Sequence, residues 1–236
     1  MMGTNRCIDR TGPTRLLSPL LLVLLYGVVA TWLLIDAGQA SAAHVVEVPV
    51  LSAVNFNNKG AFQVMVISWD QQATPDPVEA KWGNNRVRVK GTALDALGKA
   101  FFYAVRQSDS LHPTGTISIY GAAYAPVSND GPSAGAAMAI GFLAVLRGDP
   151  ILRGVALTGT LQPEGRIGPV GAIPDKVRAT AREGYRTILI PQGQLDNGRF
   201  SDPKWNLNGL AMELGLTIKE VATIAEAYEL MTGRRL

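Results

Sequence analysis

The chain has 236 residues, of which 47% are hydrophobic and 17% are charged, and its formal net charge at pH 7 is +3. Its single cysteine, Cys7, excludes an internal disulfide and any cysteine cluster that would hold a metal. The small net charge lacks the basic excess of a nucleic-acid-binding domain. Length and composition therefore predict one globular domain and one unusually apolar segment.

The apolar segment lies near the start of the chain. Three arginines precede an uncharged run at 16–35, and an Ala-Ser-Ala sequence ends at Ala42. This order is typical of a signal peptide, but the run is also about as long as a helix needs to cross a bilayer. We expect residues 1–42 to be a signal peptide or an uncleaved membrane anchor. Residues 43–236 would then form an exported domain, periplasmic or otherwise extracytoplasmic.

The first elements after this segment are predicted strands. The segments 44–54 and 61–69 are rich in Val, Ile and Phe with partial alternation, and the segment 86–90 alternates charge with Val. The intervening stretch 71–85 carries prolines, a glycine and adjacent asparagines, which is typical of an exposed loop. Apolar residues at helical spacing then predict a core-facing helix at 92–107.

The second half of the chain alternates between strands and helices. A strand is predicted at 114–122, and the helix at 134–146 is apolar on nearly every face, so we expect it to be buried centrally. The remaining predicted elements are a strand at 155–158, a hairpin at 159–171, a helix at 174–183, strands at 187–191 and 216–221, and a helix at 222–232. Together they predict an α/β (α+β) fold in a single domain.

A candidate nucleophile, Ser133, lies between the strand at 114–122 and the buried helix, in Asp130-Gly131-Pro132-Ser133-Ala134-Gly135. The Gly-x-Ser-x-Gly spelling is also that of the nucleophile elbow in α/β-hydrolases, whose histidine follows the serine. Here both histidines, His44 and His112, precede Ser133, which argues against that fold. A histidine-first arrangement with His112 and Asp130 stays open, although Asp130 is only three residues from the serine.

Lys176 offers another base for Ser133. A neutral lysine amine can take the proton of a serine if burial lowers its pKa by roughly 2 to 4 units from about 10.4. Its neighbours at helical spacing include no acid: Ala172, Ile173, Ala179 and Thr180. The backbone N–H groups of Ala134 and Gly135, at a helix start, could stabilise an oxyanion. The alternatives are a solvated lysine and a helix-capping serine.

These features resemble the proteolytic domain of the Lon family of Ser-Lys peptidases, over roughly residues 117–230. Four elements agree in order and spacing: the motif at 130–135, Leu157-Thr158-Gly159, the hairpin at 165–171 and Lys176. The resemblance implies a mixed sheet with packed helices. It also implies Ser133 as nucleophile, Lys176 as general base, Thr158 as the hydrogen-bond partner of the lysine and Asp130 as a residue shaping the site.

The chain also departs from the Lon pattern. Ala172 stands where the family usually has a second glycine, and the family's opening motif does not align before Thr92. No phosphate-binding loop is spelled in the sequence: Gly98-Lys99-Ala100 lacks the leading glycine and the hydroxyl. The closer parallel is therefore an exported Lon-like protein without an ATPase domain. Another sequence, Ser201-Asp202-Pro203-Lys204, fits Ser-x-x-Lys, but its proline is unsuited to the required helix.

The sequence as a whole predicts an ATP-independent serine endopeptidase that cuts unfolded or flexible polypeptides. We expect no metal or other cofactor and no nucleic-acid partner. The resemblance implies a homo-oligomeric ring, often a hexamer, and the N-terminal segment would allow membrane attachment. The alternative is a binding or assembly module with the same fold, either catalytically silent or dependent on a partner.

Overall fold

The computed structural model describes residues 44–54, 59–72, 76–83, 87–108, 111–123, 127–195 and 206–236. These residues belong to one compact unit, 42–236. The predicted signal peptide or anchor at 1–42 and the Ser-x-x-Lys sequence at 201–204 lie outside the described residues. Within the described ranges, no helix is both long and apolar enough to cross a membrane.

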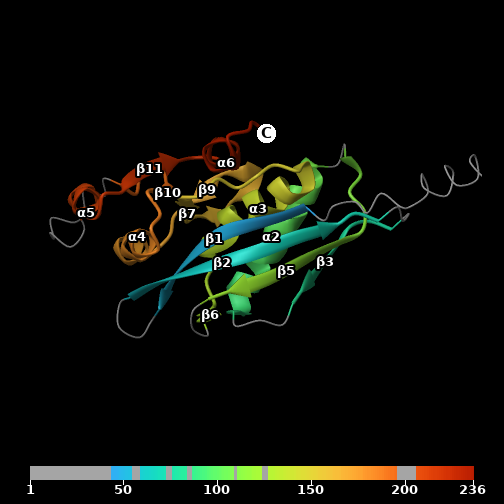
Figure 1. Cartoon of the computed structure of the whole chain (residues 1–236), viewed down its shortest axis with the longest axis horizontal. Coiled ribbons are helices and arrows are strands. Elements are labelled where there is room, and N and C mark those ends of the chain that lie inside the picture. Colours follow the sequence, from blue (N-terminus) through green and yellow to red (C-terminus); the bar gives the residue numbers. More distant parts are fainter. Residues whose placement is uncertain are drawn as a thin grey trace, which may run out of the picture. The chain divides into compact units, whose positions relative to one another are not determined.

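The largest sheet has four strands in the order β1-β2-β5-β3 (Figure 1). Strand β1 (His44–Val54) pairs with β2 (Lys59–Asp70), and β2 pairs with β5 (Thr116–Ala122), both in antiparallel register. The edge strand β3 (Glu79–Trp82) runs parallel to β5. Alternate residues of β1 and β2 are buried, so this sheet turns one apolar face toward the core.

A second sheet is wholly parallel, with the order β11-β10-β7. Its strands are β7 (Val155–Leu157), β10 (Thr187–Pro191) and β11 (Thr217–Val221). Two short pairs complete the strands: β4 (Val87–Val89) with β6 (Val127–Asn129), and β8 (Thr160–Leu161) with β9 (Ile167–Gly168). The β8–β9 pair lies within the predicted hairpin at 159–171.

The α-helices of the described ranges are α2 (Gly91–Gln107), α3 (Gly135–Arg147), α4 (Ile173–Arg182), α5 (Leu207–Leu214) and α6 (Ile224–Thr232). Helix α3 packs against β1 and β2, and α2 packs against α3 (Figure 1). Helix α4 packs against β1, β2 and β10, α5 lies beside α4 and β11, and α6 contacts α3, β7 and β11. Every residue of α3 from Gly135 to Leu146 is buried, as its apolar sequence predicts.

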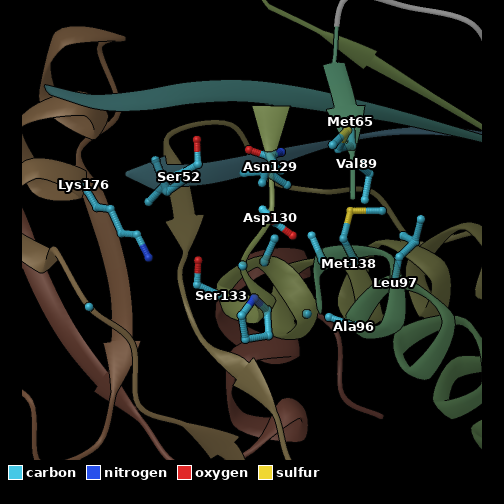
Figure 2. A pocket seen from close by; sticks show the side chains of 18 of the residues that line it. Ser52, Met65, Val89, Ala96, Leu97, Asn129, Asp130, Ser133, Met138 and Lys176 are labelled. Carbon is cyan, nitrogen blue, oxygen red and sulfur yellow. The ribbon is translucent and has the colours of Figure 1, made fainter. Parts of the chain in front are cut away.

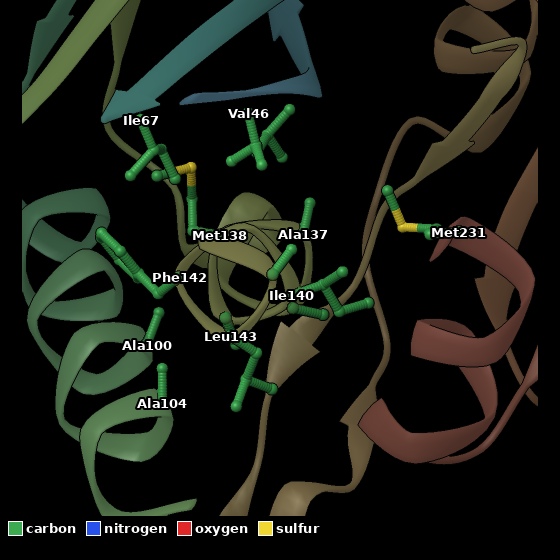
Figure 3. Close-up of a cluster of buried hydrophobic side chains, with 14 of the residues drawn as sticks. Val46, Ile67, Ala100, Ala104, Ala137, Met138, Ile140, Phe142, Leu143 and Met231 are labelled. Carbon is green, nitrogen blue, oxygen red and sulfur yellow. The ribbon is translucent and has the colours of Figure 1, made fainter. Parts of the chain in front are cut away.

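The core around α3 is built from large residues facing small ones (Figure 3). Phe142 of α3 meets the ring of Phe101 edge-on, with the ring centroids 5.7 Å apart, and Ala100 and Ala104 let α2 approach α3 closely. On the opposite side, Val46 and Ile67 of the sheet cover the helix. This packing holds the N-terminal end of α3, where Ser133 lies, in a fixed place.

The α/β class is confirmed, and the main departures from the predicted elements are additions. Strand β3 falls in the predicted loop at 71–85, because all four of its side chains are exposed and show no apolar alternation. Helix α5 was missed although it carries ordinary signals: the Asn206 side chain accepts a hydrogen bond from Gly209 N at 2.8 Å, and Gly215 ends the helix in a left-handed conformation.

Gly141 of α3 tests the tightness of this core. A Cβ at Gly141 would meet Val48 and Ile67 of the sheet, so we expect Gly141→Ala to destabilise the protein by about 1–3 kcal/mol. A Cβ at Gly98 of α2 meets no atom within 4 Å, and Gly98→Ala should be stabilising by roughly 0.5–1 kcal/mol. Urea denaturation of both variants measures the two changes, and equal effects would contradict the packing described.

Candidate active site

Ser133 lies in a single 3-10 turn, η2 (Pro132–Ala134), directly before α3. Its carbonyl accepts a hydrogen bond from Gly159 N at 2.9 Å, and Ala136 N donates to the Gly159 carbonyl at 3.1 Å. A Cβ at Gly135 would stand 3.2 Å from the Leu161 nitrogen, so the small residue allows this close approach. The serine turn is therefore fastened by two backbone hydrogen bonds to the segment that follows β7.

Lys176 lies in the first turn of α4 and is almost fully buried, with 2% of its surface exposed. Its Nζ donates to Thr158 Oγ1 at 2.9 Å, and Thr158 Oγ1 in turn lies 3.4 Å from the Ser133 carbonyl oxygen, to which it donates. Burial lowers the pKa of Lys176 to about 8, because the charged ammonium is separated from water. About a tenth of the amine is therefore neutral at pH 7, far more than for a lysine in water.

The turn before α4 contains Ala172, the residue that stands where the Lon family usually has a second glycine. Ala172 adopts φ +55° and ψ +36°, a left-handed conformation that glycine enters more readily than alanine. Its carbonyl accepts a hydrogen bond from Lys176 N at 3.1 Å, which closes the first turn of α4. The alanine is accommodated in the geometry that the usual glycine would take.

The serine turn and the lysine helix face a shared cavity of about 510 Å³. Ser133, Lys176 and Asp130 all line it, and in Figure 2 the hydroxyl of Ser133 and the amine of Lys176 project toward the same space. The end away from the lysine is apolar and includes Met65 and Met138. The arrangement resembles a cleft with a reactive end and a neighbouring pocket for an apolar group.

Asp130 contributes to the wall of the cavity. Its carboxylate occupies the space where a Cβ would stand at Gly91, the first residue of α2. Its carbonyl accepts a hydrogen bond from Thr92 Oγ1 at 2.7 Å. Asp130 therefore joins the start of α2 to the serine motif.

The structure brings together Ser133, Lys176, Thr158 and Asp130, while their chemical roles stay predictions. Within the described ranges no hydrogen bond joins Ser133 Oγ to Lys176 Nζ; such bonds are often loose before substrate binds. The N–H of Gly135 donates to the Pro132 carbonyl, and the predicted oxyanion role of Ala134 and Gly135 is not tested by this geometry.

The histidine-first alternative has no structural support. Neither His44 nor His112 lines the cavity, and the ring of His44 lies 3.4 Å from the Asp149 carbonyl. Nor do the described residues include a group of three or more His, Cys, Asp or Glu side chains that could hold a metal ion. At the cavity, the buried amine of Lys176, whose pKa is lowered, is suited to act as a base.

Sequence reasoning missed three polar residues beside the cavity: Ser52, Gln63 and Asn129. Ser52 and Asn129 line the cavity, and Gln63 hydrogen-bonds both of them from β2. A signal was present, since Gln63 interrupts an apolar strand, but its partner Asn129 lies 66 residues away. Only the folded arrangement of β2 and β6, which belong to different sheets, shows that the two amides meet.

Comparison of the sequence with known proteins identifies the family of this chain. The family described as Lon protease (S16) C-terminal proteolytic domain matches residues 103–227. A Lon protease of Azorhizobium caulinodans is 46% identical over 63 residues, covering 27% of this chain and 7% of that protein. A Lon protease of Buchnera aphidicola is 35% identical over 103 residues, covering 43% and 12%. The matched part of the chain thus spans about a tenth of the length of these relatives.

The burial of Lys176 makes a prediction about stability and pH. Its folded pKa, about 8, lies below the ordinary value of about 10.4, so the unfolded chain binds more protons between these two values. The free energy of unfolding therefore rises as the pH increases from about 8 to about 10.4. Below pH 8 the lysine is charged in both states, and the whole cost of burying the ammonium destabilises the fold. We expect Lys176→Met to raise the unfolding free energy at pH 7 by up to about 3 kcal/mol.

Urea unfolding at pH 7 and pH 10.5 measures this effect, and the advantage of Lys176→Met should shrink at the higher pH. The matched control is Lys219→Met, at an exposed position of β11, which should change the free energy by less than about 0.5 kcal/mol. An advantage of Lys176→Met that is equal at both pH values would contradict a buried, titrating amine.

Proposed function

Because this chain belongs to the family of the Lon protease (S16) C-terminal proteolytic domain, we propose that it is a serine endopeptidase using a Ser133–Lys176 dyad. The observation that carries the proposal is the amine of Lys176, which is buried, has its pKa lowered to about 8 and donates to Thr158 beside the serine turn. A lysine in water would be protonated and could not accept a proton from a serine.

The reaction begins when Lys176 Nζ, in its neutral form, takes the hydroxyl proton of Ser133 as Oγ attacks the peptide carbonyl. The C–O bond that forms gives a tetrahedral oxyanion, for which we propose the backbone N–H groups of Ala134 and Gly135 as donors; that of Gly135 must first leave the Pro132 carbonyl to which it donates. The lysine then returns the proton to the leaving amine, leaving an acyl-enzyme on Ser133. Water then attacks the acyl carbon while the same amine takes its proton, and the lysine returns that proton to Ser133 Oγ as the C–O bond breaks and the acid leaves.

Thr158 and Asp130 support the dyad without touching the substrate bond. The hydroxyl of Thr158 accepts from the lysine and lies against the carbonyl of Ser133, so it keeps the amine directed toward the serine turn. Asp130 holds the wall of the cavity through its contacts with Gly91 and Thr92 of α2.

The substrates we propose are unfolded or flexible polypeptides, cut without ATP. The printed sequence spells no phosphate-binding loop, which supports independence from ATP. The apolar end of the cavity, near Met65 and Met138, suits an apolar side chain of the substrate. A folded protein buries such side chains, whereas an extended or unfolded segment exposes them. A homo-oligomeric ring accompanies the proposal on the basis of family resemblance.

Activity assays on the purified chain test the dyad. The substrate is a carboxymethylated, unfolded protein, and the assay is run with and without ATP. Ser133→Ala should abolish cleavage through an acyl-enzyme, and Lys176→Ala should lower kcat by about 10²- to 10⁴-fold. The control Lys219→Ala removes an exposed lysine and should leave kcat unchanged. If the wild type, Ser133→Ala and Lys176→Ala were equally inert and Ser133 resisted fluorophosphonate probes, a binding or assembly module would replace this proposal.

The pH profile of the same reaction belongs with this test. The neutral amine is the active form, so kcat/KM should be low below pH 7, rise through an apparent pKa of about 8 and level off above it. A profile that rises near pH 6.5, as for a histidine base, would rule out Lys176 as the general base.

Export of the chain is a separate proposal, based on the basic and apolar start of the sequence. We expect the protein in the extracytoplasmic fraction of cells. Its measured mass should match a chain that starts at Ala43 if residues 1–42 are a cleaved signal peptide, and a chain that retains residues 1–42 if they are an anchor. Recovery of the whole chain from the cytosolic fraction would exclude both forms of export.

A further inference from the structure

A buried polar cluster lies next to the reactive end of the cavity. Gln63 of β2 is 1% exposed and interrupts a strand of apolar residues. Its Nε2 donates to Ser52 Oγ and to Asn129 Oδ1, both at 2.9 Å, and Asn129 Nδ2 donates back to Gln63 Oε1 at 2.8 Å. We call Ser52, Gln63 and Asn129 the Gln63 cluster.

The Gln63 cluster joins β6 to the four-stranded sheet. Strand β6 pairs with β4 in a two-stranded sheet of its own, and Asn129 is its last residue. The carbonyl of Asn129 accepts from Lys90 N at 2.9 Å, just before α2. Asn129 is therefore held between the start of α2 and β2, and Figure 2 shows it between Ser52 and Asp130.

The segment that Asn129 begins leads directly to the nucleophile. Asp130, Gly131 and Pro132 connect Asn129 to Ser133, and Gly131 is extended, with φ −124° and ψ 154°. No atom lies within 4 Å of the place where a Cβ would stand at Gly131. Because Gly131 faces open space, the position of this connection depends on how Asn129 and Asp130 are held before it and Ser133 after it.

The same stretch of β2 also contacts the lysine helix. The carbonyl of Asp175, the residue before Lys176, fills the space where a Cβ would stand at Gly60, and Arg182 Nη2 donates to the Gly60 carbonyl at 2.9 Å. Gly60 lies three residues before Gln63 on β2. One short piece of strand therefore contacts α4 at Gly60 and the serine segment at Gln63.

We infer that Gln63 is a positioning residue for the dyad: its carboxamide sets the Asn129–Ser133 segment against β2, on which Gly60 also seats the helix of Lys176. The inference rests on the proposed peptidase function. A buried amide adds little net stability when all its bonds are made, but it demands specific partners in specific places. An apolar residue at this position could fill the same volume without directing Asn129.

The variant Gln63→Met keeps the length of the side chain and removes its hydrogen bonds. With a fluorogenic peptide, we expect kcat to fall about 10- to 100-fold with KM changed less than about 3-fold, since the dyad geometry and not the apolar pocket is disturbed. The apparent pKa of the kcat/KM profile should stay near 8, because Lys176 remains buried. Gln107→Met, at an exposed end of α2, is the matched control.

A second variant separates positioning from folding. Gln63→Met alone leaves the amide of Asn129 buried without its partner and should lower the melting temperature, whereas Gln63→Met/Asn129→Leu removes both polar groups and should restore it. We expect the double variant to regain stability but not kcat. The exchange Gln63→Asn/Asn129→Gln, which retains an amide pair, should recover part of kcat.

Hydrogen exchange gives a readout that does not depend on activity. In Gln63→Met, the amides of 129–134 should exchange faster while those of α4 keep their protection. The inference is overturned if exchange at 129–134 is unchanged, or if the double variant has the kcat of the wild type. If the wild type neither cuts peptide nor reacts with a fluorophosphonate probe, the proposed function fails, and the exchange measurement still decides whether Gln63 holds the segment.

Discussion

Helix α3 has no side facing water between Gly135 and Leu146, and this burial constrains its surroundings. A helix enclosed in this way needs a sheet on one side, helices on the others and small residues where they approach, which β1, β2, α2 and α6 and the alanines and glycines of α3 provide. The close packing of α3 also restricts the movement of the serine turn at its N-terminal end. Ser133 therefore stands at the end of an element that packing holds still, which suits a group that must attack from one direction.

The two halves of the site meet at a pair of adjacent residues after β7. Gly159 exchanges backbone hydrogen bonds with the serine turn, while the hydroxyl of Thr158 receives the amine of Lys176. Two neighbouring residues thus hold Ser133 by the main chain and Lys176 by a side chain. Lys176 is kept from water by its own surroundings on α4, where Ile173 and Val177 are buried in a second apolar cluster, and this burial lowers the pKa of the amine.

Local patterns in the sequence were enough to predict the buried α3 and to single out Ser133 and Lys176 as candidates. Their roles as nucleophile and base were named through family resemblance and stay predictions. Thr158 was named through family resemblance, since a threonine in a strand has no chemical signal of its own. The pairing of Gln63 with Asn129 was out of reach, as it depends on where β6 settles against β2. Strand β3 was also missed, because an exposed edge strand of four residues carries no hydrophobic pattern.

The left-handed alanine before the lysine helix has a consequence for motion. Glycine at position 172 would let the turn pass between several backbone conformations, whereas alanine narrows that choice and holds its unusual one only while the neighbouring structure supports it. The joint between the β9 hairpin and α4 is for that reason stiff. In the proposed dyad, the amine of Lys176 approaches Ser133 by rotation of its own four-carbon side chain, because the turn that leads into α4 is restricted.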